Sequence, residues 1–227
     1  MIILNRALDL IFPPICGFCG KVYNKYICDD CIRIVNVIAL NKQDNYNNKF
    51  FKKHLYIFKY EDIIREKIIK FKFENETYLH RTFAEAILNN EENIKFIEQY
   101  DYLIPVPIHK KRKKQRGYNQ SELIARVICN EIKNIKLQTN IIVKDKNIVP
   151  QSTLNQKERE RNIKNVYKIV NKKNVKNKKI LLLDDIYTTG STANECSKIL
   201  IEAGCKEVGI LTIAKDWKEI MVWKSLK

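Results

Sequence analysis

Two adjacent carboxylates followed by a turn of hydroxyl residues carry the densest chemistry of the chain. The segment LLLDDIYTTGST at 181–192 places Asp184 and Asp185 after an apolar run, and Gly190 lets the backbone approach a ligand closely. A turn rich in Thr and Gly that leads into a helix presents unpaired N–H groups to a phosphate. The hydroxyl side chains that add donors are Thr188, Thr189, Ser191 and Thr192.

The two carboxylates suit the rest of a phosphorylated sugar. Ionised Asp184 and Asp185 only accept hydrogen bonds, as a sugar diol requires, and they can help to hold Mg²⁺. An apolar strand that ends in Asp is also typical of P-loop NTPases, but the absence of any G-x-x-x-x-G-K-[ST] segment excludes that class. The remaining alternative is a buried strand and a capped helix without a ligand. We interpret the segment as a site for a 5-phosphorylated ribose.

Four cysteines in two C-x-x-C pairs form a second candidate site, in this case for a metal. Eight residues separate the pair Cys16 and Cys19 from the pair Cys28 and Cys31. Four thiolates on two knuckles predict a closed, structural Zn²⁺ site. Disulfides are rare in a reducing compartment, and a redox C-x-x-C would need a βαβ context that this segment lacks. Four ordinary cysteines without a metal are the other alternative. The isolated cysteines are interpreted as small buried hydrophobes: Cys129, Cys196 and Cys205.

Basic residues are unevenly distributed along the chain. The 42 Lys and Arg residues exceed the 26 Asp and Glu residues, and the net charge of +16 favours nucleic acid or phosphorylated metabolites as partners. One basic patch spans 157–179. A denser patch, either a nucleic-acid contact or a solvated loop, comprises Lys110, Lys111, Arg112, Lys113, Lys114 and Arg116.

Strands and helices that alternate after residue 101 have to position the phosphate site. The continuous apolar run ILLLDDI at 180–186 is typical of a strand buried on both faces, and a helix is expected over 192–203. The pattern predicts an α/β fold, a mostly parallel sheet flanked by helices, with ligands beyond the carboxyl ends of the strands. The other expected elements are strands YLIPVP, NIIVK and EVGILTIAK, and a helix at 119–132 with Leu123, Val127 and Ile132 inward.

The N-terminal part is expected to form a small unit of its own. Residues 1–12 read as a short amphipathic helix, and the polar stretch 41–50 reads as a linker. We therefore expect a helix and zinc ribbon over 1–45 and the main domain over 50–227. The main domain is expected to begin with a strand at 54–60 and helices at 61–71 and 83–99.

The expected location follows from segments that the chain lacks. No run approaches the ~20 apolar residues of a membrane span, and no small-residue cleavage site follows the N-terminal segment. A soluble, cytoplasmic protein is expected. Three histidines lie outside the phosphate motif and are interpreted as surface or packing residues: His54, His80 and His109.

Several segments together resemble a known family. The segment at 181–192 resembles the phosphoribosyl diphosphate loop of type I phosphoribosyltransferases. With PVPIHKKRKKQRGYNQ at 105–120, PQSTLNQKERERN at 150–162 and FPPICGFCG at 12–20, the chain resembles the ComF competence-protein family. The resemblance implies a type I phosphoribosyltransferase-like core that binds phosphoribosyl diphosphate with Mg²⁺, an N-terminal zinc ribbon, and a role in DNA uptake during natural transformation.

The resemblance also implies roles for two further segments. Residues 150–162 would form a mobile hood, from which Arg159 and Arg161 close over the diphosphate. Purine-salvage relatives place an Asp that handles the proton of the base where this chain has Thr188, so the site is expected to bind the sugar diphosphate without acting on a purine. The loop after YLIPVP would lie on the diphosphate side, its nearest residues being Arg116, Gly117, Asn119 and Gln120.

Two classes of function remain open at this point. The net charge, the basic segments and the ribbon favour a protein that handles single-stranded DNA, in contact with the DNA-uptake machinery. The phosphate turn and its two carboxylates favour an active phosphoribosyltransferase with an unknown acceptor. A ribbon-bearing adaptor that binds neither ligand is a third possibility.

Overall fold

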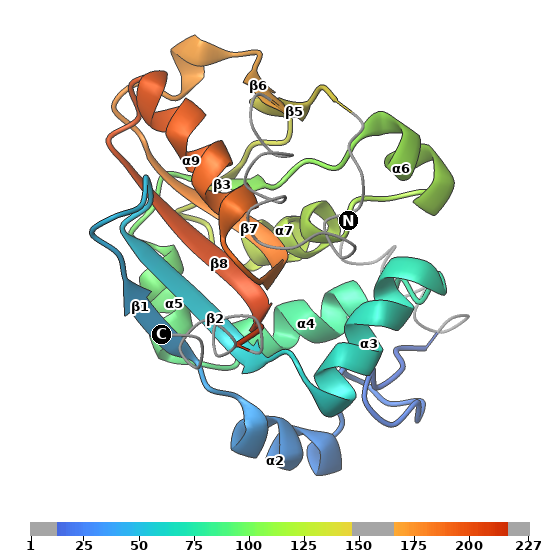
Figure 1. Cartoon of the computed structure of the whole chain (residues 1–227). Coiled ribbons are helices and arrows are strands. Elements are labelled where there is room, and N and C mark those ends of the chain that lie inside the picture. Colours follow the sequence, from blue (N-terminus) through green and yellow to red (C-terminus); the bar gives the residue numbers. More distant parts are fainter. Residues whose placement is uncertain (1–12, 147–165, 218–227) are drawn as a thin grey trace, which may run out of the picture.

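The computed structural model describes residues 13–146 and 166–217. In this part of the chain a six-stranded sheet has the order β1-β2-β8-β7-β3-β4, with every neighbouring pair parallel except β1 and β2 (Figure 1). Its strands are β1 (Lys42–Asn45), β2 (Lys53–Lys59), β3 (Tyr102–Pro105), β4 (Lys136–Leu137), β7 (Lys179–Tyr187) and β8 (Glu207–Lys215). A separate antiparallel pair consists of β5 (Ile142–Lys144) and β6 (Tyr167–Ile169). The expected mostly parallel α/β fold is confirmed.

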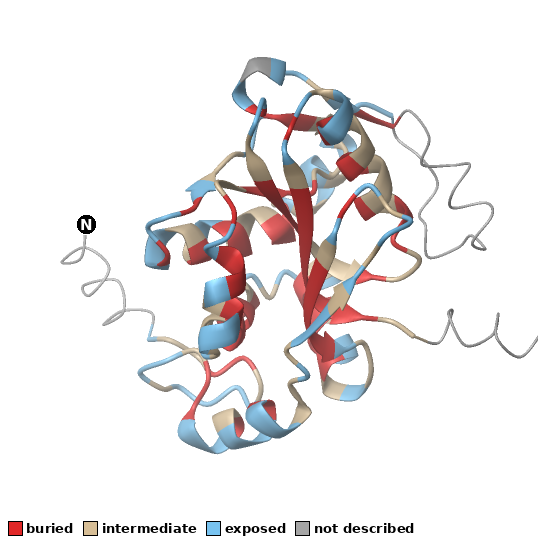
Figure 2. Ribbon diagram, turned by 90° about the vertical axis from the view of Figure 1, so that its left-hand side faces the viewer, coloured by how far each residue is buried: buried red, intermediate tan, exposed pale blue. Residues whose placement is uncertain are grey.

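Helices cover both faces of the main sheet. They are α2 (Asp29–Ile38), α3 (Asp62–Phe73), α4 (Leu79–Leu88), α5 (Glu91–Ile97), α6 (Lys110–Arg116), α7 (Gln120–Glu131) and α9 (Ser191–Glu202), with a 3₁₀ turn η2 (Lys172–Asn174). Side chains alternate along β7, so Leu181 and Leu183 join the core beneath α3, α4 and α7, while Ile180 and Leu182 join the core beneath α9. Figure 2 shows the buried central strands between helices whose outer surfaces are exposed.

The order of the strands places a topological switch point between β3 and β7. From β3 the chain passes through α7 to β4 on one side, whereas from β7 it passes through α9 to β8 on the other side. The two helices therefore lie on opposite faces of the sheet, and ligands of open α/β sheets bind beyond the carboxyl ends of the strands at such a switch point. The expected phosphate turn follows β7 at this position.

The cysteine-bearing segment packs directly on the main domain. Cys16, Cys28 and Cys31 belong to the same core as α4, and a Cβ on Gly17 would collide with the side chain of Thr82. The backbone N–H of Tyr26 donates to Glu85 of α4 at 3.0 Å. The segment is thus part of one continuous hydrophobic core.

Two expectations for the N-terminal half are wrong in detail. Residues 42–45, expected in a linker, form β1, because an edge strand needs no apolar run when one side faces solvent. The single helix expected over 83–99 is two helices, α4 and α5. Asn90 takes an extended conformation between them, and its side chain accepts from the N–H groups of Glu92 and Asn93 as an N-cap. The division into 1–45 and 50–227 stays a prediction.

The other expected strands and helices lie close to their expected positions. The helix at 119–132 is α7, in which Ile132 is buried as expected and Leu123 and Val127 are half-buried against the same core, while Ile124, Ala125 and Ile128 are also fully buried. The NIIVK strand, as β5, belongs to the small sheet. The expected helix at 1–12 lies outside the described residues, and none of the described helices is long and apolar enough to cross a membrane.

Candidate functional site

The two carboxylates lie near the carboxyl end of β7, at the switch point. Asp184 and Asp185 follow four buried residues of the strand and are themselves only partly buried. The N–H of Asp185 donates to Oδ1 of Asp184 at 2.9 Å, which fixes that carboxylate against its own backbone. A strand buried on both faces therefore delivers two acidic groups to the ligand edge of the sheet.

The turn after β7 is built for close approach of a ligand. Gly190 has φ 74° and is the N-cap of α9, and a Cβ there would collide with the ring hydroxyl of Tyr187. Thr189 Oγ1 lies 2.7 Å from Ser191 Oγ and accepts from the N–H of Ser191 at 3.3 Å. The first N–H groups of a helix have no partner within the helix, so this turn and α9 can hold a phosphate. The structure thus brings the expected set together: Asp184, Asp185, Thr188, Thr189, Gly190, Ser191 and Thr192.

Cationic side chains from three other elements approach the carboxylates. Lys72, at the end of α3, forms an ion pair with Asp185, with Nζ 2.8 Å from Oδ2 and with side chains only 18% and 15% exposed. Lys144, at the end of β5, interacts electrostatically with Asp184, and burial lowers its pKa. Burial also lowers the pKa of Arg116, whereas the negative charge of Asp185 raises it.

Burial and the neighbouring charged groups change the pKa of Asp184. Burial, followed by the neighbouring Asp185, raises the pKa of Asp184 to about 7, although Lys72 and Lys144 act in the opposite direction. A carboxyl group in this state gains from a cation that binds to its ionised form. The two adjacent carboxylates therefore fit a site for Mg²⁺ carried by a phosphorylated ligand.

The basic stretch expected as a loop is the helix α6. Its two arginines, Arg112 and Arg116, are four residues apart and half-buried, whereas the lysines are exposed. Lys113 pairs with Glu122 at 2.9 Å. Gly117 ends the helix at φ 84°. The helix thus turns arginines toward the site and these lysines toward solvent: Lys110, Lys111, Lys113 and Lys114.

Two residues expected near the ligand have structural partners. Asn119 is the N-cap of α7, where its side chain accepts from Ser121 N–H and donates to the carbonyl of Val106. Gln120 is buried and accepts from Arg116 at 2.6 Å. Both side chains therefore position Arg116 and the loop around Gly117. The expected hood residues, Arg159 and Arg161, lie outside the described residues.

Lys72 and Lys144 were not among the residues expected at the site. Helical spacing could have found Lys72, because it follows the inward residues Ile64, Ile68 and Phe71 and lies four residues after Ile68. No comparable signal marks Lys144. Its position depends on the small sheet, in which its Nζ lies 5.3 Å from the ring centroid of Tyr167.

The four cysteines of the paired motifs meet in one cluster. The sulfur atoms of Cys16, Cys19, Cys28 and Cys31 all lie within 4.8 Å of one another. The N–H of Cys28 donates to the sulfur of Cys16 at 3.3 Å. Burial raises the pKa of the Cys16 thiol. Hydrogen bonds from backbone N–H groups, first that of Cys19, lower it by more in total, and the resulting pKa is about 7. Four sulfurs at this spacing with N–H donors around them fit a structural Zn²⁺ site.

The remaining cysteines and histidines are buried or half-buried. Cys196 and Cys205 are buried and Cys129 is half-buried, close to the expectation. His54 is buried, with Nε2 2.8 Å from Thr212 Oγ1, and burial holds its pKa well below the usual range. His109 is the N-cap of α6.

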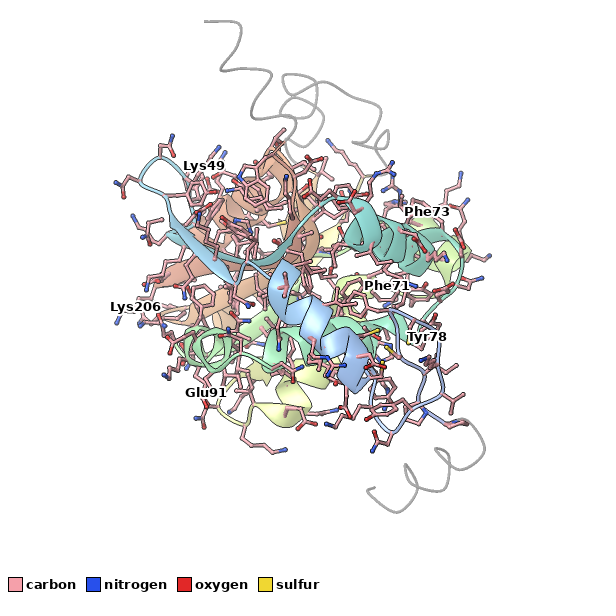
Figure 3. The ribbon with its side chains drawn as sticks, turned by 90° about the horizontal axis from the view of Figure 1, so that it is seen from below. Lys49, Phe71, Phe73, Tyr78, Glu91 and Lys206 are labelled. Atoms are coloured by element: carbon pink, nitrogen blue, oxygen red, sulfur yellow. The ribbon has the colours of Figure 1, made fainter. Side chains whose placement is uncertain are left out.

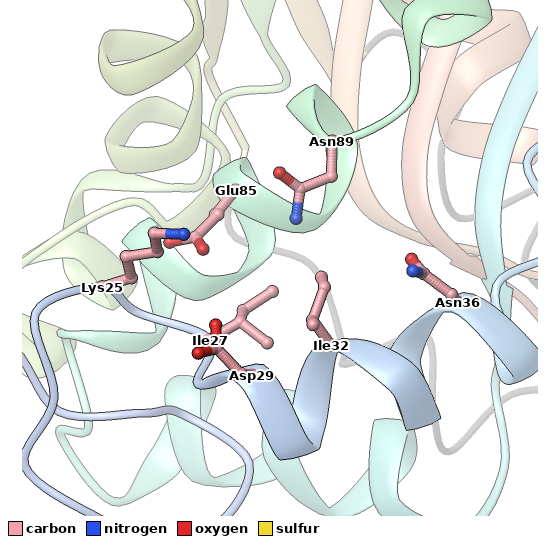
Figure 4. A pocket seen from close by; sticks show the side chains of 7 residues that line it. All are labelled: Lys25, Ile27, Asp29, Ile32, Asn36, Glu85 and Asn89. Atoms are coloured by element: carbon pink, nitrogen blue, oxygen red, sulfur yellow. The ribbon is translucent and has the colours of Figure 1, made fainter.

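A pocket of about 350 Å³ lies away from the phosphate turn, between α2 and α4. Figure 4 shows Ile27 and Ile32 on one side of it, with Glu85 of α4 and its C-cap residue Asn89 facing them. Burial raises the pKa of Glu85, which accepts from the backbone at Tyr26. Sequence reasoning did not identify this pocket, and the hydrogen bond from Tyr26 to Glu85 joins the cysteine segment to α4 beside it.

The switch point, the two carboxylates and the phosphate turn define an α/β domain of the phosphoribosyltransferase type. Residues 113–226 match the family model described as the phosphoribosyl transferase domain. Competence protein F of Haemophilus influenzae is 30% identical over 208 residues, which cover 89% of this chain and 85% of that protein. The chain belongs to the family of this competence protein, ComF.

Two further relatives extend the comparison. Competence protein ComFC of Bacillus subtilis is 23% identical over 205 residues, covering 88% of this chain and 77% of that protein. DNA utilization protein YhgH of Escherichia coli K12 is 25% identical over 115 residues, covering 51% of this chain and 49% of that protein. The similarity to both competence proteins thus extends over most of the chain.

Proposed function

We propose that this protein binds phosphoribosyl diphosphate, or a similar ribose phosphate, with Mg²⁺ at the carboxyl ends of β3 and β7. The observation that carries the proposal is the phosphate turn at 188–192, which follows Asp184 and Asp185 at the end of β7, with Lys72 paired to the second carboxylate. Four cationic side chains around two carboxylates leave an excess of positive charge, which suits a ligand with several phosphates. These side chains are Lys72, Arg112, Arg116 and Lys144.

Each end of such a ligand has a counterpart in the site. The turn at 188–192 would hold the 5-phosphate, and Asp184 with Asp185 would accept from the ribose hydroxyls. Arg116 and Lys72 would face the diphosphate, joined from the hood by Arg159 and Arg161. Mg²⁺ would neutralise phosphate charge next to the carboxylates.

We further propose that the protein handles single-stranded DNA in the cytoplasm during DNA uptake, together with the DNA-uptake machinery. Two similar proteins carry the name competence protein, and a third is a DNA utilization protein. Helix α6 supports the proposal because its lysines are exposed and its first turn contains no acidic residue. In this proposal Zn²⁺ at the four cysteines has a structural role.

An active phosphoribosyltransferase is the second candidate, favoured by the intact pair Asp184 and Asp185. In that reaction the bond from ribose C1 to the diphosphate breaks, a bond from C1 to the acceptor forms, and diphosphate leaves. Arg116 and Lys72 would stabilise the negative charge that develops on the departing diphosphate. Thr188 stands where purine-salvage relatives have an Asp, so the acceptor would not be a purine handled in that way.

Calorimetric titration of the zinc-loaded protein with phosphoribosyl diphosphate and Mg²⁺ tests the proposal. We expect saturable binding that is lost in the double variant Asp184→Ala, Asp185→Ala. The control variant Glu91→Ala, Glu92→Ala removes an adjacent pair of exposed acids on α5 and should bind like the wild type. Binding that survives in the first variant would contradict the site. Release of diphosphate with an added acceptor would support the transferase candidate.

A further inference from the structure

An exposed aromatic ring lies next to the candidate phosphoribosyl site. Phe73, the last residue of α3, is 71% exposed, and the guanidinium of Arg116 lies over its ring, 5.2 Å from the centroid. Because Arg116 occupies one face of the ring and most of the residue is exposed, the opposite face is accessible. Figure 3 shows Phe73 at the edge of the molecule, away from Lys206 and Glu91.

The ring is held in place by its neighbours on α3 and after α6. Tyr118 stacks on Phe71, with ring centroids 5.7 Å apart, and its hydroxyl donates to the carbonyl of Phe71. Arg116 is itself fixed by Gln120. These contacts join the end of α3 to the end of α6, so the Phe73 ring and the Arg116 guanidinium keep their relative position.

Phe73 lies between the phosphate site and the basic helix α6. The preceding residue, Lys72, pairs with Asp185 in the phosphate site. On its other side, Arg116 ends the basic helix α6, whose lysines are exposed. An aromatic ring beside a row of cations is the combination with which proteins bind single-stranded nucleic acid, since phosphates pair with the cations and an unpaired base stacks on the ring.

We propose that Phe73, held by Arg116, is a stacking platform for one unpaired base of a single strand whose phosphates contact α6. The inference rests on the proposed function, because it assumes that a single strand binds along α6. It adds a base contact between the basic helix and the phosphoribosyl site. A duplex would not use the platform, because its bases are already stacked on one another.

Fluorescence anisotropy of the full-length, zinc-loaded protein with a labelled oligothymidylate tests this platform. We expect Phe73→Ala to weaken binding about 10-fold, since one base stacked on an aromatic side chain contributes roughly 1–3 kcal/mol. Phe73→Trp should restore affinity, and the dependence on salt should not change because no charge is removed. The control variant Ile34→Ala, at an exposed apolar residue of α2, should bind like the wild type.

An oligonucleotide of the same length with abasic sites separates stacking from other effects. The wild type and Phe73→Ala should bind it equally, because no base is present to stack. Equal affinities of both proteins for oligothymidylate would overturn the platform while leaving single-strand binding intact. An equal loss on both strands would overturn it as well, and would indicate a general role of Phe73 in the surface. Failure of the wild type to bind either strand would overturn the proposed DNA function together with the platform.

Discussion

Lys72 of α3 and Asp185 of β7 form an ion pair, with Nζ 2.8 Å from Oδ2, at the ligand edge of the sheet. The pair joins a helix near the start of the domain to the strand that precedes the phosphate turn. The neighbouring Asp184 has a raised pKa, first because the group is buried and then because Asp185 lies beside it. A cation from the protein thus occupies a position next to the proposed Mg²⁺ site.

Removal of the Lys72 cation should destabilise the protein without ligand. We expect Lys72→Met to lower the free energy of unfolding by roughly 1–3 kcal/mol, because a partly buried Asp185 loses its partner beside a second carboxylate. Millimolar Mg²⁺ should restore part of the loss. Urea unfolding with and without Mg²⁺ measures both effects.

The matched control for this variant is Lys70→Met on the same helix. Lys70 pairs with Glu66 at 3.0 Å, but both side chains are more exposed than those of the Lys72 pair. Exposed pairs contribute little to stability, so this change should have a small effect that does not respond to Mg²⁺. Equal losses in the two variants would contradict a special role for Lys72.

The raised pKa of Asp184 makes stability depend on pH. The pKa is about 7 in the folded protein, whereas an unfolded Asp titrates at ~3.9. The contribution of the neutral carboxyl to stability is therefore fully present below about pH 4 and is lost as the pH rises through 7. The free energy of unfolding of Asp184→Asn, relative to that of the wild type, should therefore increase between pH 4.5 and pH 8. The increase should be on the order of 2 kcal/mol, after allowance for the partial exposure of the carboxyl group. A constant difference across this range, measured by urea unfolding, would disprove the assignment.

Loss of metal from the cysteine cluster should affect the whole domain. Cys16, Cys28 and Cys31 belong to the core that also contains α4, so chelation or Cys16→Ser should lower the melting temperature of the main domain. We expect one zinc per chain by elemental analysis, and less than one in Cys16→Ser. The control Cys129→Ser should retain the full zinc content. A zinc-free protein with an unchanged melting temperature would argue against a structural metal.

The lysines of α6 should determine how DNA binding responds to salt. For single strands the slope of log K against log salt changes by ~0.7 for each phosphate contact. The variant Lys110→Gln, Lys111→Gln should therefore reduce the slope by about 1.4 if each lysine contacts one phosphate, and weaken binding. Lys176→Gln, Lys206→Gln removes the same charge from exposed positions near the amino end of β8 and should leave the slope nearly unchanged. Anisotropy titrations at several salt concentrations would show whether the two variants differ.

The sequence identified the parts of the fold whose patterns are local. Four consecutive apolar residues before Asp184 predict a central strand, and β7 and β8 are found where they were expected. The four cysteines likewise predict their own cluster, because the spacing of each C-x-x-C pair limits how its sulfurs can lie. For these elements, composition over a few residues was enough.

Other features depend on contacts that are distant in sequence. The polar strand β1 has no apolar signature, because it is defined by its pairing with β2. The buried face of α7 also includes Ile124, Ala125 and Ile128, which were not expected, because packing against α4 and β3 decides which residues are buried. Lys72 reaches the site only because α3 ends beside β7. Pairings of this kind could not be inferred from local patterns.

A crystal structure of the protein with phosphoribosyl diphosphate and Mg²⁺ would test the proposed site most directly. We expect the 5-phosphate within about 3 Å of backbone N–H groups of residues 188–192, in the range of a hydrogen bond. The ribose hydroxyls should contact Asp184 and Asp185, with the diphosphate toward Lys72 and Arg116. A ligand bound elsewhere, for example in the pocket between α2 and α4, or a site that stays empty at saturating ligand, would contradict the proposal.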